Sequence, residues 1–148
     1  ADQLAVNLIP QIGVLDEVVY TSEEMKMQNE GRKIMHLPEL RVNCTCVRVP
    51  TMRSHSESIT VEFERPLSPE EARAILEDAP GIKVVDNPAE LQYPMPLDTS
   101  DQDLIYVGRI REDLSADEDT HALTFFCCGD QIRKGAATNA VQIAEYLL

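Results

Sequence analysis

The sequence predicts an α+β domain with a mixed, mostly antiparallel sheet and helices packed on one face. Segments with the two-residue alternation of strands are interspersed with helical segments, but not in the strict order of a parallel α/β fold. No Gly-x-Gly-x-x-Gly motif follows a predicted strand, so no dinucleotide-binding half is expected within this chain. Because 148 residues is close to the commonest domain size, we expect residues 1–148 to form a single domain.

Local signals place three helices. Thr21 and Glu24 have capping-box spacing and predict a helix over residues 21–35. Residues 68–71 read Ser-Pro-Glu-Glu, which is a second helix start followed by an apolar stripe. The segment 134–148 is the third predicted helix, with alanines and valine near one face.

Five segments predict strands: residues 41–49, 58–64, 83–85, 104–111 and 121–128. Residues 58–64 alternate apolar and polar side chains, as in a strand with one solvated face. Residues 121–128 are the most apolar and predict the central strand. Residues 86–103 contain three prolines and predict a long ordered loop.

Two groups of polar residues are candidates for chemistry. Glu23 and Lys26 share a helix face, although a solvated ion pair would look the same. A cationic fork beside an imidazole suits carboxylate binding next to a proton transfer. A solvated loop with an incidental histidine is the alternative for this second group. A polar connector between two predicted strands brings the residues of this second group within ten positions of each other: Arg48, Arg53, His55, Ser56 and Glu57.

Charge and hydropathy exclude several functions. The formal net charge of −13 disfavours nucleic acids and anionic membrane surfaces as partners. No apolar segment approaches the roughly 20 residues of a membrane span. The N-terminus lacks both the pattern of a signal peptide and an initiator Met, so we expect a fragment of a longer cytoplasmic chain.

The cysteine spacings do not favour a metal. The pairs Cys44/Cys46 and Cys127/Cys128 form C-x-C and C-C motifs rather than the C-x-x-C pairs of common zinc sites. We therefore expect no metal site, and buried reduced thiols instead.

Eight segments, taken in order, resemble a known family. Together they are similar to the C-terminal half of the aspartate-β-semialdehyde dehydrogenases, the catalytic and dimerisation domain, and the resemblance covers essentially the whole chain. That domain has the fold of the C-terminal domain of glyceraldehyde-3-phosphate-dehydrogenase-type enzymes. The segments are NLIPQI at 7–12, EEMKM at 23–27, NE at 29–30, CVRVP at 46–50, HSES at 55–58, VGRIR at 107–111, KGAA at 134–137 and VQIAE at 141–145.

The resemblance implies a reaction and its partners. It is the reversible, NADP-dependent conversion of aspartate semialdehyde and phosphate to β-aspartyl phosphate through a cysteine thioester. The biosynthetic direction leads toward lysine, threonine and methionine. The resemblance also implies a homodimer, a cytoplasmic or plastid-stroma location, and NADP bound mainly by an N-terminal domain outside this chain.

The matching motifs assign roles residue by residue. By resemblance, His55 is the acid/base group and Arg48 grips the substrate α-carboxylate. Glu23 binds the substrate amino group and Lys26 receives phosphate. The segment around Gly135 resembles the part that closes near the nicotinamide, where Asn139 and Gln142 are candidate cofactor contacts.

One departure from the family pattern matters. The family's nucleophilic cysteine lies upstream of the segment matching residues 7–12, and is not in this chain. Cys44 follows an asparagine, as that nucleophile does, but it precedes Arg48 where the family has none, so we expect it to be structural. The chain alone is therefore expected to be inactive.

Two alternatives stay open. One is a non-catalytic homologue, or a stand-alone dimerisation module, that kept the fold. The other is a related acyl-phosphate reductase acting on another substrate, such as an N-acetylglutamyl phosphate. The spacing of Glu23 and Lys26 argues against this second alternative, because Glu23 would bind a free amino group.

Overall fold

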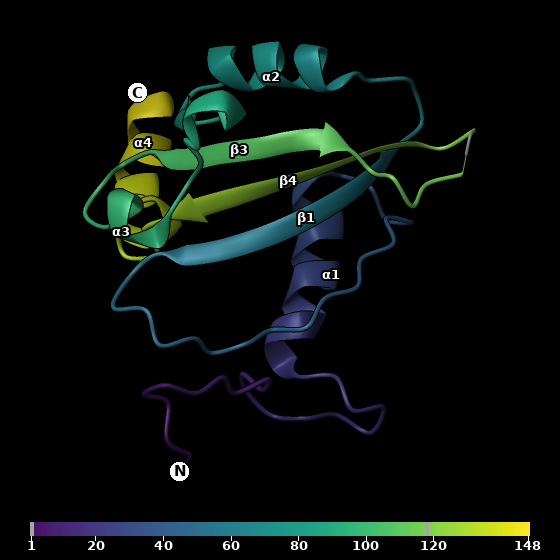
Figure 1. The fold of residues 1–148 in the computed structure, drawn as a ribbon. Helices are drawn as coiled ribbons and strands as arrows, with labels where there is room; N and C mark the ends of the chain where they lie inside the picture. Colours follow the sequence, from purple (N-terminus) through teal and green to yellow (C-terminus); the bar gives the residue numbers. More distant parts are fainter. Residues whose placement is uncertain (1, 118) are drawn as a thin grey trace. The chain divides into compact units, whose positions relative to one another are not determined.

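The computed structural model describes residues 2–117 and 119–148. The chain divides into two compact units, the N-terminal unit (residues 1–51) and the sheet unit (residues 52–148). Figure 1 traces both along the chain, and each is described by itself below. The prediction of one domain over residues 1–148 stays a prediction.

The N-terminal unit is built around the helix α1, Ser22–Ile34. Thr21 is its N-cap, and Thr21 and Glu24 form both hydrogen bonds of a capping box, as predicted. Two acidic residues lie in the first turn and two basic residues in the last turn, which complements the helix dipole.

The predicted strand over residues 41–49 is wrong. Among the described residues of the N-terminal unit, β-type pairing is limited to isolated bridges, one joining Ile9 to Arg48 and one joining Leu15 to Thr21. The alternating sequence has no neighbouring strand to pair with, and a backbone N–H within it, that of Cys46, bonds to the Glu24 carboxylate instead.

The sheet unit contains a four-stranded sheet in the order β1-β4-β3-β2. The pairs β1/β4 and β4/β3 are antiparallel and β2/β3 is parallel, so the predicted α+β class with a mixed, mostly antiparallel sheet is confirmed. The most apolar strand, β4, lies inside the sheet as predicted. The strands are β1 His55–Phe63, β2 Ile82–Val84, β3 Ile105–Glu112 and β4 His121–Gly129.

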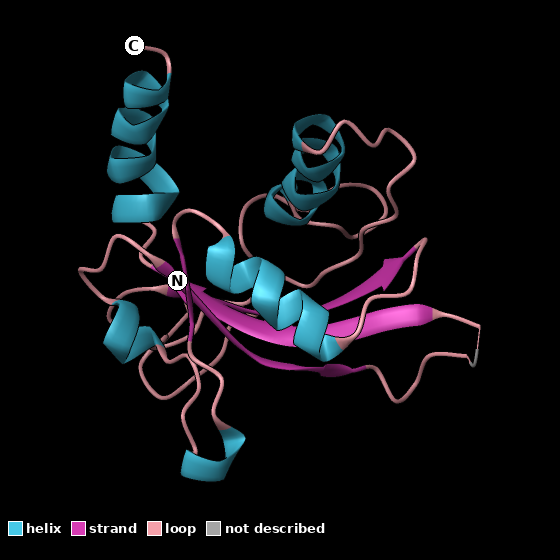
Figure 2. Ribbon diagram, turned by 90° about the horizontal axis from the view of Figure 1, so that it is seen from above, coloured by secondary structure: helices cyan, strands magenta, loops and turns pink. Residues whose placement is uncertain are grey.

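The helix α2, Pro69–Asp78, covers one face of this sheet (Figures 1 and 2). Ser68 caps it through a second capping box, as the sequence predicted. Its buried Ala72 packs against strand residues in a small core completed by Val107, Ile110 and Leu123. Burial of these apolar side chains holds α2 on the sheet.

A β-bulge interrupts β3. Gly108 pairs with Phe126 and Arg111 with Thr124, so β3 has one residue more than β4 between these pairs. The buried Asp86 carboxylate stabilises the bulge, since it accepts hydrogen bonds from the backbone N–H groups of Arg109 and Ile110. It also pairs with Arg73 of α2, with 2.7 Å between Nη2 and Oδ2.

The rest of the sheet unit is helical turns and connections. The segment predicted as an ordered loop contains two short helices, η1 Pro88–Glu90 and α3 Pro96–Thr99. The predicted C-terminal helix is present as α4, Thr138–Tyr146, preceded by a wide π-helical turn, Arg133–Ala137. In the described part of the chain, no helix is long and apolar enough to cross a membrane.

Candidate functional site

Glu23 and Lys26 form an ion pair on the surface of α1. Lys26 Nζ lies 2.7 Å from Glu23 Oε1, and both side chains are accessible to solvent. The hydrogen bond with Glu23 and the charge of Glu23 raise the pKa of Lys26. The predicted shared face is confirmed, and it presents one anionic and one cationic group side by side.

Arg48 lies in the extended segment of the same unit. Its backbone N–H and carbonyl both bond to Ile9, at 2.9 and 3.1 Å, and the residue is exposed. The backbone of Arg48 is therefore fixed while its guanidinium reaches solvent. A planar guanidinium suits bidentate binding of a carboxylate.

Glu24 connects α1 to the segment that carries Arg48. Its Oε2 accepts from the backbone N–H of Thr21 at 2.7 Å, and its Oε1 accepts from that of Cys46 at 2.9 Å. The bonds from Thr21 and then Cys46 outweigh burial and lower the pKa of Glu24, so it is an anion at neutral pH. The capping-box pattern identified Glu24, but no local signal pointed to Cys46, 22 residues away.

His55 begins β1 in the sheet unit, opposite Gly129 of β4. The predicted polar connector is shorter than expected, because His55, Ser56 and Glu57 all belong to β1. Their pairing with β4 replaces the expected loop conformation, and the Ser56 hydroxyl lies 3.4 Å from Cys128 Sγ. His55 is exposed, so a substrate can come within hydrogen-bonding reach of it, as proton transfer requires.

Arg53 does not serve as an open cationic fork. Its Nη1 lies 2.8 Å from Asp101 Oδ1, and its Nε lies 2.7 Å from Oδ2 of the buried Asp130. Two carboxylates of the protein therefore occupy this guanidinium. Two cations are grouped with His55 in the sequence. Arg53 forms ion pairs within the sheet unit, and Arg48 belongs to the N-terminal unit.

The two candidate cofactor residues meet at one lysine. Lys134 Nζ donates to Gln142 Oε1 at 2.6 Å and to Asn139 Oδ1 at 3.4 Å. The two amide oxygens thus face the same ammonium group. Their amide N–H groups are the remaining donors for an outside acceptor.

Three of the four thiols are poorly suited to nucleophilic attack. Burial, with the neighbouring Cys44 thiol, raises the pKa of Cys46 to about 11, and burial raises the pKa of Cys127 to about 12. Burial also raises the pKa of Cys128. These thiols stay protonated at neutral pH, whereas the thiolate is the nucleophile.

Cys44 is half-buried and lines a pocket of about 420 Å³ within the N-terminal unit, together with Tyr20, Glu24 and Asn43. Tyr20 donates to the Asn43 side chain across this pocket. Within residues 2–117 and 119–148, no group of three or more His, Cys, Asp or Glu side chains is arranged to hold a metal ion.

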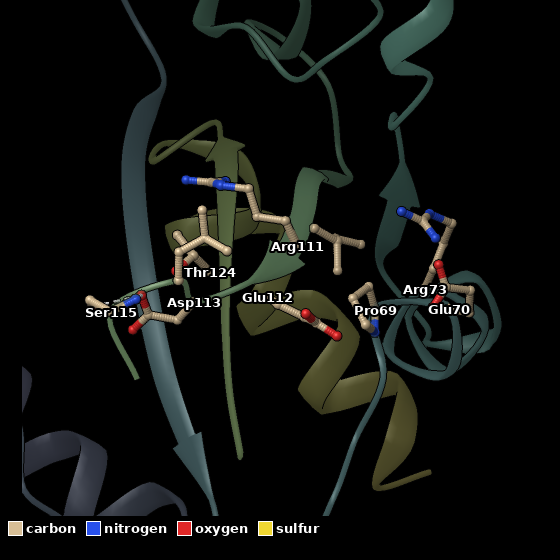
Figure 3. Close-up of a pocket in the computed structure, with 10 residues that line it drawn as sticks. Pro69, Glu70, Arg73, Arg111, Glu112, Asp113, Ser115 and Thr124 are labelled. Carbon is tan, nitrogen blue, oxygen red and sulfur yellow. Dashed lines mark hydrogen bonds between the residues drawn. The ribbon is translucent and has the colours of Figure 1, made fainter. Parts of the chain in front are cut away.

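A larger pocket of about 730 Å³ lies in the sheet unit, away from His55, and Figure 3 shows the residues that line it. Thr124 at this pocket pairs with Thr60, five residues along β1 from His55, which corresponds to about 17 Å. Its walls carry charges of both signs, including Glu70, Arg73 and Arg111. No residue predicted to take part in chemistry lines it, so size alone does not identify the site.

Comparison with known proteins places the chain in a family. The family described as "Semialdehyde dehydrogenase, dimerisation domain" matches residues 1–134. The aspartate-semialdehyde dehydrogenase of Aquifex aeolicus is 51% identical over 146 residues, covering 99% of this chain and 42% of that protein. That of Campylobacter jejuni is 54% identical over 142 residues, covering 96% of this chain and 40% of that protein.

The solved structures agree. Aspartate semialdehyde dehydrogenase II of Vibrio cholerae, crystallised in complex with ASA, superposes with a TM-score of 0.91 and 40% identity, over 99% of this chain and 42% of that one. The chain thus spans about two fifths of the length of the relatives it matches. From its sequence and fold, the chain belongs to the semialdehyde dehydrogenase dimerisation-domain family.

Proposed function

We propose that this chain is the substrate-binding and dimerisation part of an NADP-dependent aspartate-semialdehyde dehydrogenase. The reaction is the reversible conversion of L-aspartate 4-semialdehyde and phosphate to L-4-aspartyl phosphate, a step of amino-acid biosynthesis. The observation that carries the proposal is the Glu23–Lys26 pair on an exposed helix face. It stands in a chain 51% identical to such an enzyme over 146 residues.

Three residues of the N-terminal unit recognise the substrates. Arg48 binds the α-carboxylate of aspartate semialdehyde through its planar guanidinium. Glu23 binds the substrate ammonium group, and Lys26 binds phosphate as a compact charge. Because Glu23 and Lys26 neutralise each other without ligand, binding replaces one ion pair with two.

His55 moves the protons of the reaction. A cysteine thiolate from outside this chain attacks the aldehyde carbon, and His55 as its imidazolium protonates the resulting oxyanion. Neutral His55 then accepts that hydroxyl proton, while the hydride on the same carbon would pass to the nicotinamide ring that NADP supplies when bound, leaving the thioester. Hydrogen phosphate attacks the thioester carbonyl, releases its proton to solvent and expels the cysteine as thiolate.

The cofactor would be held partly by Asn139 and Gln142. Their amide oxygens are engaged by Lys134, which leaves the amide N–H groups as donors to acceptor oxygens of a nicotinamide cofactor. NADP supplies the hydride-accepting ring when bound. The residues present fit this role, while most of the cofactor site would lie in the N-terminal domain of the longer protein.

The chain by itself is proposed to be inactive and to pair with a second copy in the intact enzyme. The raised pKa values of Cys46, Cys127 and Cys128 support an external nucleophile. The matching family, described as a dimerisation domain, supports a homodimer.

The test replaces the proposed acid/base group. In the full-length protein, His55→Ala is expected to lower turnover by ~10²–10⁴-fold, the usual loss for an acid/base residue. NADP reduction with aspartate semialdehyde and phosphate measures it. His121→Ala is the matched control, because His121 begins β4 at the opposite end of the same strand pair.

Three results would contradict the proposal. Turnover of His55→Ala within a few-fold of wild type would remove the role of His55. Activity in the 148-residue chain itself would mean that one of its own thiols, with Cys44 the first candidate, is the nucleophile. A full-length protein without activity would favour the non-catalytic homologue or a different acyl-phosphate substrate.

A further inference from the structure

Asp130 is a fully buried carboxylate at the end of β4 whose two oxygens hold different parts of the sheet unit. Oδ2 accepts from the backbone N–H of Asp101 at 2.7 Å and lies 2.7 Å from Arg53 Nε. Oδ1 accepts from the backbone N–H groups of Ile132 and Arg133, at 2.9 and 3.2 Å. Both oxygens of this buried carboxylate therefore have partners, as buried polar groups generally do.

This carboxylate remains ionised in spite of its burial. Burial raises the pKa of Asp130, but the hydrogen bonds from Asp101, Ile132 and Arg133 and the Arg53 guanidinium outweigh it and lower the pKa to about 2. Arg53 Nε meets Oδ2 as a close ion pair rather than as a well-directed hydrogen bond. The Asp130 carboxylate is therefore charged at neutral pH.

The contacts of Asp130 extend in two directions, called here the two arms of the network. The first arm runs through Arg53 and Ser54 toward His55. Arg53, held by Asp130 and Asp101, is separated from His55 only by Ser54. Ser54 is 4% exposed, has a left-handed backbone with φ of +75°, and donates its N–H to Gln131 Oε1 at 2.9 Å. Contacts on both preceding residues thus determine how the chain enters β1 at His55.

The other arm leads to the C-terminal helix. Asp130 Oδ1 caps the turn at Ile132 and Arg133, and the Asp130 carbonyl accepts from Gly135 N–H at 3.2 Å. The π-helical turn that starts there carries Lys134, which bonds to Asn139 and Gln142. One side chain therefore links the start of β1 to the start of this helical segment.

We propose that Asp130 is a positioning residue for catalysis: it fixes His55 relative to the helical segment that carries Asn139 and Gln142. This inference rests on the proposed function, since it needs His55 as the acid/base group. Asp130 itself touches no substrate in this scheme. Its task is to keep the imidazole in line with the reacting atoms, where a displacement of about 1 Å can cost ~10²-fold in rate.

The test is Asp130→Asn in the full-length dehydrogenase. The amide keeps the size of the side chain but replaces one oxygen by an N–H donor, so it cannot serve both arms. We expect kcat to fall about 10- to 100-fold, as for losses of groups that orient a catalytic ligand. The KM for aspartate semialdehyde is expected to stay within about threefold, because its proposed binding residues lie in the N-terminal unit.

The matched control is Asp103→Asn. This carboxylate belongs to the same region but accepts from the side chains of Arg133 and Thr138 rather than from Arg53. It is also exposed, so its loss leaves no buried group without a partner. We expect its kcat to remain within about threefold of wild type.

A double substitution separates positioning from general stability. If Asp130 acts through His55, then Asp130→Asn lowers kcat in the wild-type background but adds no further loss to His55→Ala. Equal losses in both backgrounds, or an unchanged kcat for Asp130→Asn alone, would overturn the inference. Near-normal turnover of His55→Ala alone would instead overturn the proposed role of His55, so the two failures are distinguishable.

A second variant covers the case in which Asp130→Asn does not fold. Arg53→Gln leaves Asp130 with its three backbone donors and removes only the arm toward His55. Its kcat is expected to fall about tenfold, again with no added loss in the His55→Ala background. A normal kcat for Arg53→Gln would overturn the inference.

Discussion

At the scale of single residues, the backbone of Ser54 adopts a conformation that serine disfavours. Its φ of +75° belongs to the left-handed region that glycine adopts readily, and the residue is almost fully buried. Its hydroxyl finds no hydrogen-bond partner in the described part of the chain. Strain of this kind persists where the surroundings over-determine the backbone, and here the ion pairs of Arg53 and the pairing of β1 do so.

Ser54→Gly is therefore expected to stabilise the protein. Relief of the backbone strain and removal of an unpaired buried hydroxyl together outweigh the extra entropy of glycine in the unfolded chain. The free energy of unfolding should rise by about 1 kcal/mol. Urea titration of the full-length protein measures it.

The companion variant Ser54→Ala removes the hydroxyl but keeps the strained φ. It should gain less than Ser54→Gly does. A loss of stability on Ser54→Gly would show that the Ser54 hydroxyl is paired in the intact protein.

At the scale of elements, the sequence predicts what is local and misses what is distant. Thr21 and Ser68 identify two helix starts because every group of a capping box lies within four residues. Residues 41–49 have the composition of a strand, but a strand also requires a partner.

The same limit applies to the site. Motif resemblance proposes His55, but the connection of Arg53 to Asp130 crosses 77 residues and no local pattern reveals it.

Substitution of glycine by alanine is expected to have opposite effects on stability at two positions, Gly108 and Gly31. A Cβ on Gly108 in β3 would collide with the backbone carbonyl of Val85 and lie 2.7 Å from Pro94 Cδ. Gly108→Ala should therefore destabilise the protein by about 1–3 kcal/mol, the usual cost of overpacking.

Gly31, within α1, is the control. A Cβ there would meet only Leu40 Cδ2 at 3.9 Å, an ordinary contact. Gly31→Ala should stabilise by about 0.5–1 kcal/mol through helix propensity. Denaturant titration of both variants is the measurement, and equal effects of one sign would refute the steric argument.

At the scale of the whole molecule, acidity and stability are linked. Hydrogen bonds from N–H groups lower the pKa values of Glu24, Glu71, Asp103 and Asp113, and the pKa of Asp130 reaches about 2. A carboxyl with a lowered folded-state pKa adds stability above its unfolded pKa, and this stability is lost as the pH falls through the folded value.

We expect the melting temperature to fall as the pH drops from about 4.5 toward 2. The reference values of 4.5 for Glu and 3.8 for Asp set the upper end of this window, and Asp130 sets the lower end. Below the isoelectric point of about 4.5, protonation also makes the net charge increasingly positive, and the growing repulsion adds to the loss. Thermal melts across this range measure the change.

Asp130→Asn should flatten the lowest part of the curve, because it has no carboxyl to protonate there. A melting temperature that rises steadily toward pH 2 would contradict the stabilising role of these ionised carboxyls.

The bulge in β3 shifts the alternation of inward and outward side chains by one residue partway along the strand. Before it, odd-numbered Val107 faces the core, and after it the even-numbered Ile110 does. Strict alternation would have turned Arg109 and Arg111 inward and Ile110 out to solvent. Straightening the strand without removing a residue would thus exchange an isoleucine for two arginines in the core, so the bulge determines which side chains of β3 are buried.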